Sequence, residues 1–178
     1  GRRRRIGLGR VSVLFTDMED PQMLDLPIPA WAADLAPGDI VLFRFPVSED
    51  AERAPVKRRP CLIVDRRSFG DDAFLDLAYG TAADGKANCG FEVRVHHEAD
   101  FVAAGLTRPT RFVCARRVLV HPRHPGFTPY DDAGPRIGSL PPSLRPRLDD
   151  LHDKIRRAMI EGWRSRPKLT VLNHPFAI

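Results

Sequence analysis

No stretch of this 178-residue sequence is long and apolar enough to form a membrane-spanning helix, which needs roughly 20 such residues. A secretory signal is also missing, because Arg10 interrupts the short apolar stretch after residues 2–5 and acidic residues follow it. We therefore expect no membrane partner. Residues 1–27 show no clear period and start with Gly rather than Met, so we expect a disordered or artefactual leader.

Cysteine is scarce in the sequence. Only Cys61, Cys89 and Cys114 are present, and no two of them have the CxxC spacing of metal and redox sites. An odd number of cysteines without a paired framework favours a reducing environment, and we expect a cytoplasmic protein. Cys61 and Cys114 fall within predicted strands, where a thiol packs as a small apolar side chain.

Motifs for metal binding, phosphate-binding loops and nucleophilic catalysis are missing as well. The pairs His96–His97 and His121–His124 lack helical i,i+4 spacing and have no acidic or cysteine residues at ligand spacing. No Gly-rich phosphate motif is present, and no serine or cysteine has an identifiable base as its partner. The sequence therefore predicts no metal and no cofactor, and it offers no support for protease or esterase chemistry.

The composition is that of a folded, slightly basic domain. Apolar residues make up 43% of the chain, which is enough for a hydrophobic core. The 17 prolines favour short elements with punctuated connections over a helical bundle. The formal charge of +5 is compatible with a polyanionic partner but is weak evidence by itself.

Residues 28–122 predict a mainly β domain of five to seven short strands. The strands are rich in β-branched and aromatic residues, and no helix of 10 to 15 residues separates them, which favours an antiparallel barrel or sandwich over a parallel sheet. A polar turn is expected at 66–72, and short helical turns at 28–35 and 99–104. The predicted strands are Asp39–Phe45, Pro60–Asp65, Phe74–Tyr79, Phe91–Val95 and Arg111–Ala115, the last with a continuation at Arg117–Val120.

A long C-terminal helix follows a Pro/Gly-rich linker expected at 123–142. Apolar residues spaced three and four apart predict this helix within 143–166, with Ser143 as its N-cap and Pro146 in its first turn. Residues 167–178 form the expected tail, in which 169–172 is an undecided late strand.

The stretch from Gly38 to Asp65 carries the clearest signal of function. It reads GDIVLFRFP, then a loop of mixed charge, then KRRPCLIVD. This hairpin resembles the opening of the MazF/PemK-like toxins of bacterial type II toxin–antitoxin systems. Further along, the strand end Tyr79–Ala82 (YGTA) and the segment Gly105–Thr110 (GLTRPT) resemble later motifs of that family, in the same order.

The resemblance implies an SH3-like β-barrel that forms a homodimer and cleaves single-stranded RNA without a metal. In such enzymes the ribose 2′-hydroxyl attacks the adjacent phosphate and leaves a 2′,3′-cyclic phosphate and a 5′-hydroxyl. The arginine before the proline corresponds to Arg59, and the threonine at the strand end corresponds to Thr81. Further candidates for RNA binding are the cations Arg44, Lys57, Arg58 and Arg116.

The chemistry of phosphate cleavage gives Arg59 and Thr81 distinct roles. A guanidinium is planar, permanently charged and able to donate two hydrogen bonds to the oxygens of the phosphorane transition state. A threonine hydroxyl can orient the phosphate or relay a proton, but it is not a strong base by itself. The plainer interpretation is that Arg59 belongs to a solvated charge run and that Thr81 only ends a strand.

One departure from the family pattern keeps two other functions open. Some members carry an arginine and an aspartate on the fifth strand, where this sequence has Val113 and Ala115. A catalytically impaired barrel that binds RNA or protein is therefore the first alternative, and a gyrase-targeting toxin of the related CcdB type is the second. The implied partners are a cognate antitoxin and, for the toxin–antitoxin complex only, operator DNA.

Overall fold

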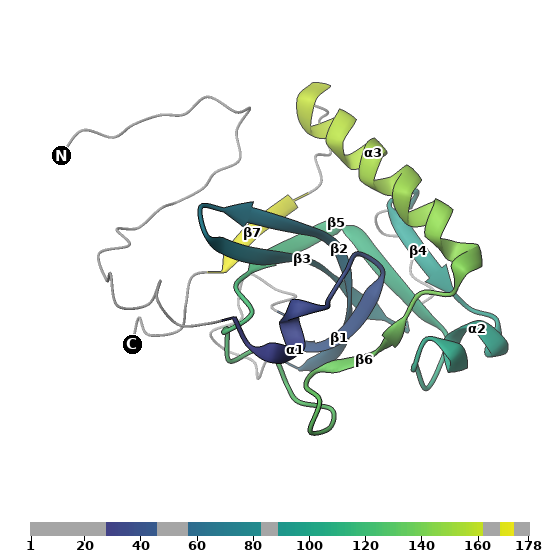
Figure 1. Ribbon diagram of the computed structural model, residues 1–178. Coiled ribbons are helices and arrows are strands. Elements are labelled where there is room, and N and C mark those ends of the chain that lie inside the picture. Colours follow the sequence, from purple (N-terminus) through teal and green to yellow (C-terminus); the bar gives the residue numbers. More distant parts are fainter. Residues whose placement is uncertain (1–27, 46–56, 83–88, 162–167, 173–178) are drawn as a thin grey trace.

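The computed structural model describes residues 28–45, 57–82, 89–161 and 168–172. In these residues the chain is mainly β: six antiparallel strands curl into a half-barrel, and the 17-residue helix α3 (Arg145–Glu161) follows them (Figure 1). The predicted mainly β class with a long C-terminal helix is confirmed. The expected leader, most of the loop of mixed charge and the last residues of the tail lie outside the described residues.

The sheet has the strand order β4-β5-β3-β2-β1-β6. A seventh strand, β7, pairs in parallel with the second half of β5 and lies off this path. Two short helices, α1 (Ala30–Ala33) and α2 (Glu98–Ala103), complete the described elements. The strands are β1 (Asp39–Arg44), β2 (Arg58–Phe69), β3 (Asp72–Thr81), β4 (Glu92–Val95), β5 (Thr110–Val120), β6 (Arg136–Ser139) and β7 (Lys168–Leu172).

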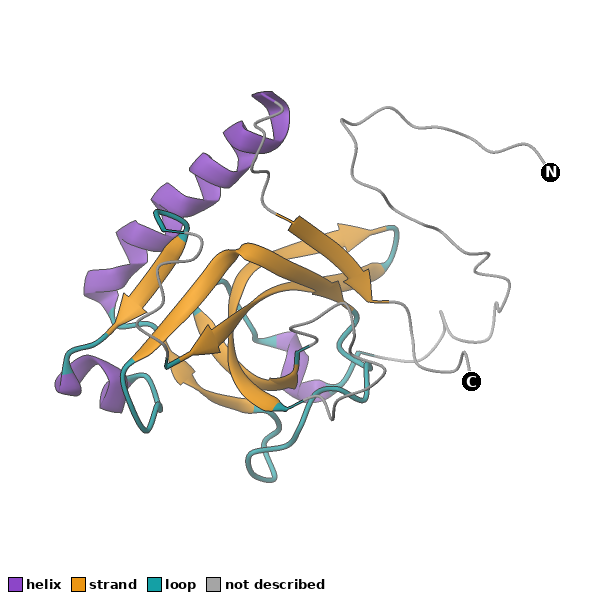
Figure 2. Ribbon diagram, turned by 180° about the vertical axis from the view of Figure 1, so that it is seen from behind, coloured by secondary structure: helices purple, strands orange, loops and turns teal. Residues whose placement is uncertain are grey.

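Both faces of the curled sheet are buried, and each has its own hydrophobic core. Successive residues of a strand point to opposite faces, so one strand supplies both cores. The inner face packs against α1, which lies in the opening of the curl, and the outer face packs against α3 (Figures 1 and 2). The inner core includes Val41, Phe43, Cys61, Ile63, Leu77, Tyr79 and Val113. The outer core includes Ile40, Leu62, Val64, Ala78, Val93, Phe112 and Cys114.

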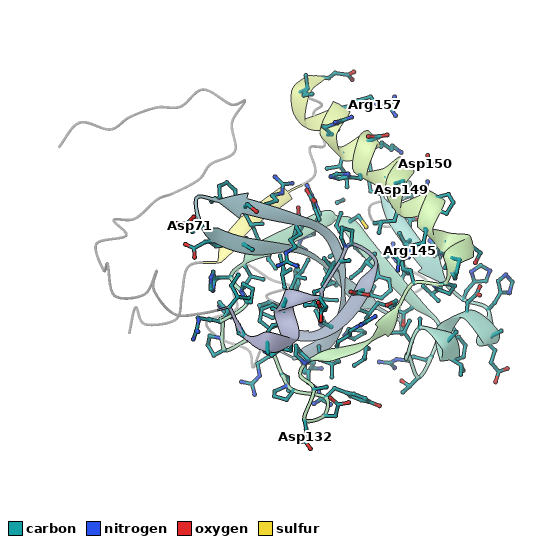
Figure 3. All side chains as sticks on the ribbon, viewed as in Figure 1. Asp71, Asp132, Arg145, Asp149, Asp150 and Arg157 are labelled. Atoms are coloured by element: carbon teal, nitrogen blue, oxygen red, sulfur yellow. The ribbon has the colours of Figure 1, made fainter. Side chains whose placement is uncertain are left out.

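Helix α3 covers the outer face with one apolar side. Leu148, Leu151 and Ile155 are buried in the outer core, as the spacing of apolar residues predicts. Asp149 and Arg157, which are exposed, project from the helix in Figure 3. Ser143 is not the N-cap of this helix, because it belongs to a 3₁₀ turn at Pro142–Leu144 that precedes α3.

The hairpin of β2 and β3 is longer than the sequence predicts. The expected turn at 66–72 is wrong, because β2 continues to Phe69 and β3 begins at Asp72. Gly70 has a φ of +61°, a left-handed conformation that glycine adopts without strain, and the turn is therefore confined to two residues. Of the polar residues 66–68, Arg66 and Arg67 are half-buried and Ser68 is exposed.

The segment expected as a linker, 123–142, is integrated into the sheet. Its residues 136–139 form strand β6, which pairs with β1. Asp39 holds this junction, because its carboxylate accepts hydrogen bonds from the Ser139 hydroxyl at 2.5 Å and from the Ala36 N–H at 2.9 Å. The aspartate of the Gly-Asp motif thus has a structural role in joining β1 and β6.

The helices of the described residues are all too short or too polar to cross a lipid bilayer.

Candidate nucleic-acid interface

Arg59 lies on the inner face of the sheet, near the start of β2. It has the same strand alternation as Cys61 and Ile63, which belong to the inner core. The Cys61 thiol donates to the Arg59 carbonyl oxygen at 3.6 Å. Burial raises the pKa of this thiol, and the Arg59 guanidinium acts against the shift. Within the described part of the chain, the buried Arg59 Nε has no hydrogen-bond acceptor.

Thr81 lies on the strand next to Arg59 and at the matching position. Cys61 pairs with Tyr79 and Leu62 with Ala78, and continuing this antiparallel register by two residues places Arg59 opposite Thr81. The close approach of Gly80 to Pro60 agrees with this register, since a Cβ on Gly80 would lie 2.7 Å from the Pro60 carbonyl oxygen.

Directly opposed residues of an antiparallel pair have their side chains on the same face. The structure therefore brings the two predicted catalytic residues together, although they are 22 positions apart in the sequence. Below them, one residue row further into the sheet, lie the buried residues Cys61, Tyr79 and Val113. Arg59 and Thr81 thus stand at the border between the inner core and solvent, and both are half-buried.

The four predicted RNA-binding cations do not all lie on the face of the sheet that carries Arg59. Lys57 has the alternation of Arg59 and is exposed. Arg44 and Arg58 lie opposite one another on β1 and β2, and both point to the outer side. Arg116 lies on β5 five residues beyond Arg111, the residue that pairs with Thr81, which is roughly 17 Å along the strand. It pairs with Lys168 of β7.

Two further arginines share the inner face with Thr81, and neither lies at a predicted site position. Arg111 of β5 pairs directly with Thr81, and Arg94 of β4 pairs directly with Arg111. Arg111 is 7% exposed, whereas Arg94 is exposed to solvent. The alternation of apolar and polar residues in each strand could have shown which face Arg94 and Arg111 share. The strand order and register that make them neighbours of Thr81 could not be read from the sequence.

Glu92 is the one carboxylate next to this group in the described residues. It lies opposite Val113, and its Oε1 accepts hydrogen bonds from Arg94 at 3.3 and 3.4 Å. Its Oε2 accepts the Phe91 N–H at 3.1 Å. Both oxygens are therefore engaged, and the described charged residues of the site, Arg59, Arg94, Arg111 and Glu92, carry a net positive charge.

A second charged cluster, formed by Asp65, Arg67, Asp76, Arg117 and His152, lies on the outer side of the sheet. Asp76 and Arg117 are fully buried and form an ion pair of 2.5 Å. Arg67 bridges Asp76 at 3.1 Å and Asp65 at 3.5 Å, and His152 of α3 lies 3.4 Å from Asp65. Burial raises the pKa of Asp76, while Arg117 and Arg67 act in the opposite direction. This network ties α3 to the sheet and is structural.

The histidines of the loop after β5 are held by backbone N–H groups. The Nδ1 of His121 accepts the Arg123 N–H at 3.2 Å, and the Nδ1 of His124 accepts the Gly126 N–H at 2.9 Å. Burial lowers the pKa of His121, and Asp72 at 3.7 Å opposes this shift. Within the described ranges, no three His, Cys, Asp or Glu residues are grouped so that they could hold a metal ion.

Comparison with known proteins does not assign this chain to a family. Neither models of protein families nor curated protein sequences match this chain. The resemblance of its motifs to the MazF/PemK-like toxins therefore stays a prediction, and the site is interpreted from its geometry.

Proposed function

We propose that this protein is a metal-independent endoribonuclease that cleaves single-stranded RNA, and that it is the toxin of a type II toxin–antitoxin system with a MazF/PemK-like, SH3-like barrel. The observation that carries the proposal is the juxtaposition of Arg59 and Thr81 on adjacent strands of one cationic face. These are the two positions to which the family resemblance assigns the chemistry.

The proposed reaction is an internal transesterification of RNA. The ribose 2′-oxygen bonds to the adjacent phosphorus as its proton leaves, and the bond from phosphorus to the 5′-oxygen breaks, with a proton passing to that oxygen. The products are a 2′,3′-cyclic phosphate and a 5′-hydroxyl. Arg59 donates hydrogen bonds to the equatorial oxygens, where negative charge accumulates. Thr81 orients the phosphate or relays a proton.

The proposed partners follow from the same assignment. A cognate antitoxin would bind the cationic face with an acidic tail and exclude RNA from it. The active toxin would be a homodimer, and the toxin–antitoxin complex would bind its operator DNA.

The decisive experiment incubates the purified protein with a long single-stranded RNA in EDTA and maps the fragment ends. We expect cleavage to cyclic-phosphate ends, with Arg59→Ala reducing the rate about 100- to 1,000-fold, the usual effect of removing one well-placed transition-state donor. Thr81→Ala should reduce the rate less. Arg157→Ala is the control, because it removes an exposed arginine from helix α3 on the outer side of the sheet and should leave the rate unchanged. Unchanged cleavage by Arg59→Ala would overturn the mechanism.

One observation favours the impaired binding module as a second candidate. Val113 and Ala115 are buried and apolar, so the fifth strand supplies neither a proton donor nor an acceptor at these two positions. RNA binding without cleavage in the same experiment would support this function. The gyrase-targeting alternative normally depends on hydrophobic and aromatic residues near the C-terminus. Trp163 and Phe176, which could be misread as such residues, lie outside the described residues.

A further inference from the structure

The cationic residues of the inner face form a row that crosses four strands. Arg94 pairs with Arg111, and Arg111 pairs with Thr81. Thr81 lies opposite Arg59 by continuation of the β2–β3 register. The row therefore runs perpendicular to the strands through β4, β5, β3 and β2, and it carries three arginines and one hydroxyl. We call it the arginine row.

The strand alternation places all four side chains on one face. Phe112 and Val93, the sequence neighbours of Arg111 and Arg94, belong to the outer core, so the two arginines point to the inner side. The close approach of a Cβ at Gly80 to Thr110 and Phe112 likewise shows that Gly80 faces outward and its neighbour Thr81 inward.

The arginine row has a closed end and an open end. At the β1 end the next position is Phe43, which is fully buried against Phe127 at 4.8 Å between ring centroids. At the β4 end Arg94 is exposed, with 45% of its side chain accessible. Arg111, between them, is nearly buried and acts as a fixed charge whose field is weakly screened by water.

We propose that the backbone of the bound single strand follows the arginine row, crossing the sheet from Arg59 towards Arg94. Adjacent strands are roughly 4.8 Å apart, so Arg59 and Arg111 flank Thr81 at about 10 Å from one another, and Arg94 lies one strand further. One phosphate lies over Thr81 and contacts Arg59, and a neighbouring phosphate contacts Arg94. This inference rests on the proposed function for its ligand, but it concerns binding and not cleavage.

Glu92 limits the affinity of the open end. Its carboxylate holds Arg94 by two hydrogen bonds and partly neutralises that arginine. A phosphate at Arg94 has to share the guanidinium with this carboxylate. Replacing Glu92 by glutamine keeps an acceptor for the Phe91 N–H and removes the negative charge, so the arginine row predicts tighter binding for Glu92→Gln.

The test measures binding of a mixed-sequence single-stranded DNA, which has no 2′-hydroxyl and cannot be cleaved by the proposed reaction. Fluorescence anisotropy over a series of salt concentrations gives the dissociation constant and its salt dependence. We expect Arg94→Ala to weaken binding about fivefold and to reduce the slope of log K against log salt by about 0.7, the value for one lost phosphate contact on a single strand. Glu92→Gln should strengthen binding.

Arg157→Ala is again the control, since it removes one exposed positive charge from helix α3 on the outer side and should leave the slope unchanged. The inference is overturned if the DNA does not bind, if Arg94→Ala keeps the wild-type slope, or if Arg157→Ala lowers the slope equally. Binding that obeys these predictions in a protein that cleaves no RNA would overturn the proposed function and leave the arginine row intact.

Discussion

At the scale of single residues, Gly80 is what allows Arg59 and Thr81 to lie side by side. A Cβ on Gly80 would lie 2.7 Å from the Pro60 carbonyl oxygen and 2.9 Å from a methyl carbon of Thr110. The first of these is backbone and cannot move without separating β2 from β3. Glycine at this position therefore serves a close approach between strands and not an unusual backbone angle.

Gly80→Ala should destabilise the protein by about 1 to 3 kcal/mol, the usual cost of adding a methyl group to a filled site. The added methyl group would also push β2 away from β3 and displace Arg59 from Thr81, so the rate of RNA cleavage should fall as well. Urea unfolding of the purified variant measures the first effect, and the RNA assay measures the second. Gly70→Asn provides the comparison, because nothing lies within 4 Å of a Cβ at Gly70 and asparagine tolerates its φ of +61°. Equal stability of Gly80→Ala and Gly70→Asn would contradict a close approach of β2 and β3 at Gly80.

At the scale of elements, the ion pair of Asp76 and Arg117 joins β3 to β5 inside the protein. Removing one member leaves the other charge buried, which typically costs about 3 to 5 kcal/mol, whereas replacing both by apolar residues is often neutral. Arg67 is the remaining partner of Asp76, and it is partly exposed. The pair thus specifies how the two strands align more than it adds to stability.

Arg117→Met should therefore be strongly destabilised at neutral pH, and a double variant with Asp76→Leu should recover most of the loss. The loss should also depend on pH. Without Arg117 the pKa of Asp76, which burial already raises, would rise further above its unfolded value. A raised acid pKa gives stability that is present at low pH and lost as the pH rises through the folded pKa.

Urea unfolding at pH 5 and pH 8 checks this sign. Arg117→Met should lose more stability relative to the wild type at pH 8 than at pH 5, and the double variant should lose similar amounts at both. A larger loss at pH 5 would contradict the assignment of Asp76 as the group left without its main partner.

Individual strands were easier to predict from the sequence than their pairing. The apolar runs of β1, β3 and β5 are rich in β-branched and aromatic residues, which predict strands. The four residues of β6 carry one large apolar side chain, Ile137, among arginine, glycine and serine, and they form a strand because Asp39 and Ser139 attach them to β1.

In the candidate site, too, residues within a motif could be predicted from the sequence, and residues brought together by strand pairing could not. Arg59 and Thr81 were found by their motifs, each on its own strand. Arg111 and Arg94 were missed because their importance lies in the β5–β3 and β4–β5 registers, which depend on contacts between distant segments. The prediction of a turn at 66–72 made the β2–β3 hairpin too short. The register of this hairpin, which sets Arg59 opposite Thr81, was therefore not predicted.

At the scale of the whole molecule, the two hydrophobic cores are built from the same strands and cannot form separately. On β2, for example, Ile63 belongs to the inner core and Leu62 to the outer core. Loss of α3 from the outer face would expose one side of strands whose other side supports α1. We therefore expect both cores to unfold in a single cooperative transition.

Two probes can follow the two cores separately. Trp31 of α1 packs on the inner side, with its ring 5.0 Å from that of Phe127, and the only other tryptophan of the sequence is Trp163. In a Trp163→Phe background, fluorescence therefore reports the inner core, while far-UV circular dichroism at the helical wavelength is dominated by α3 on the outer face. Urea titrations with the two probes should give the same midpoint and the same slope. A helical transition at lower urea than the Trp31 transition would show that α3 and the outer core unfold independently of the inner one.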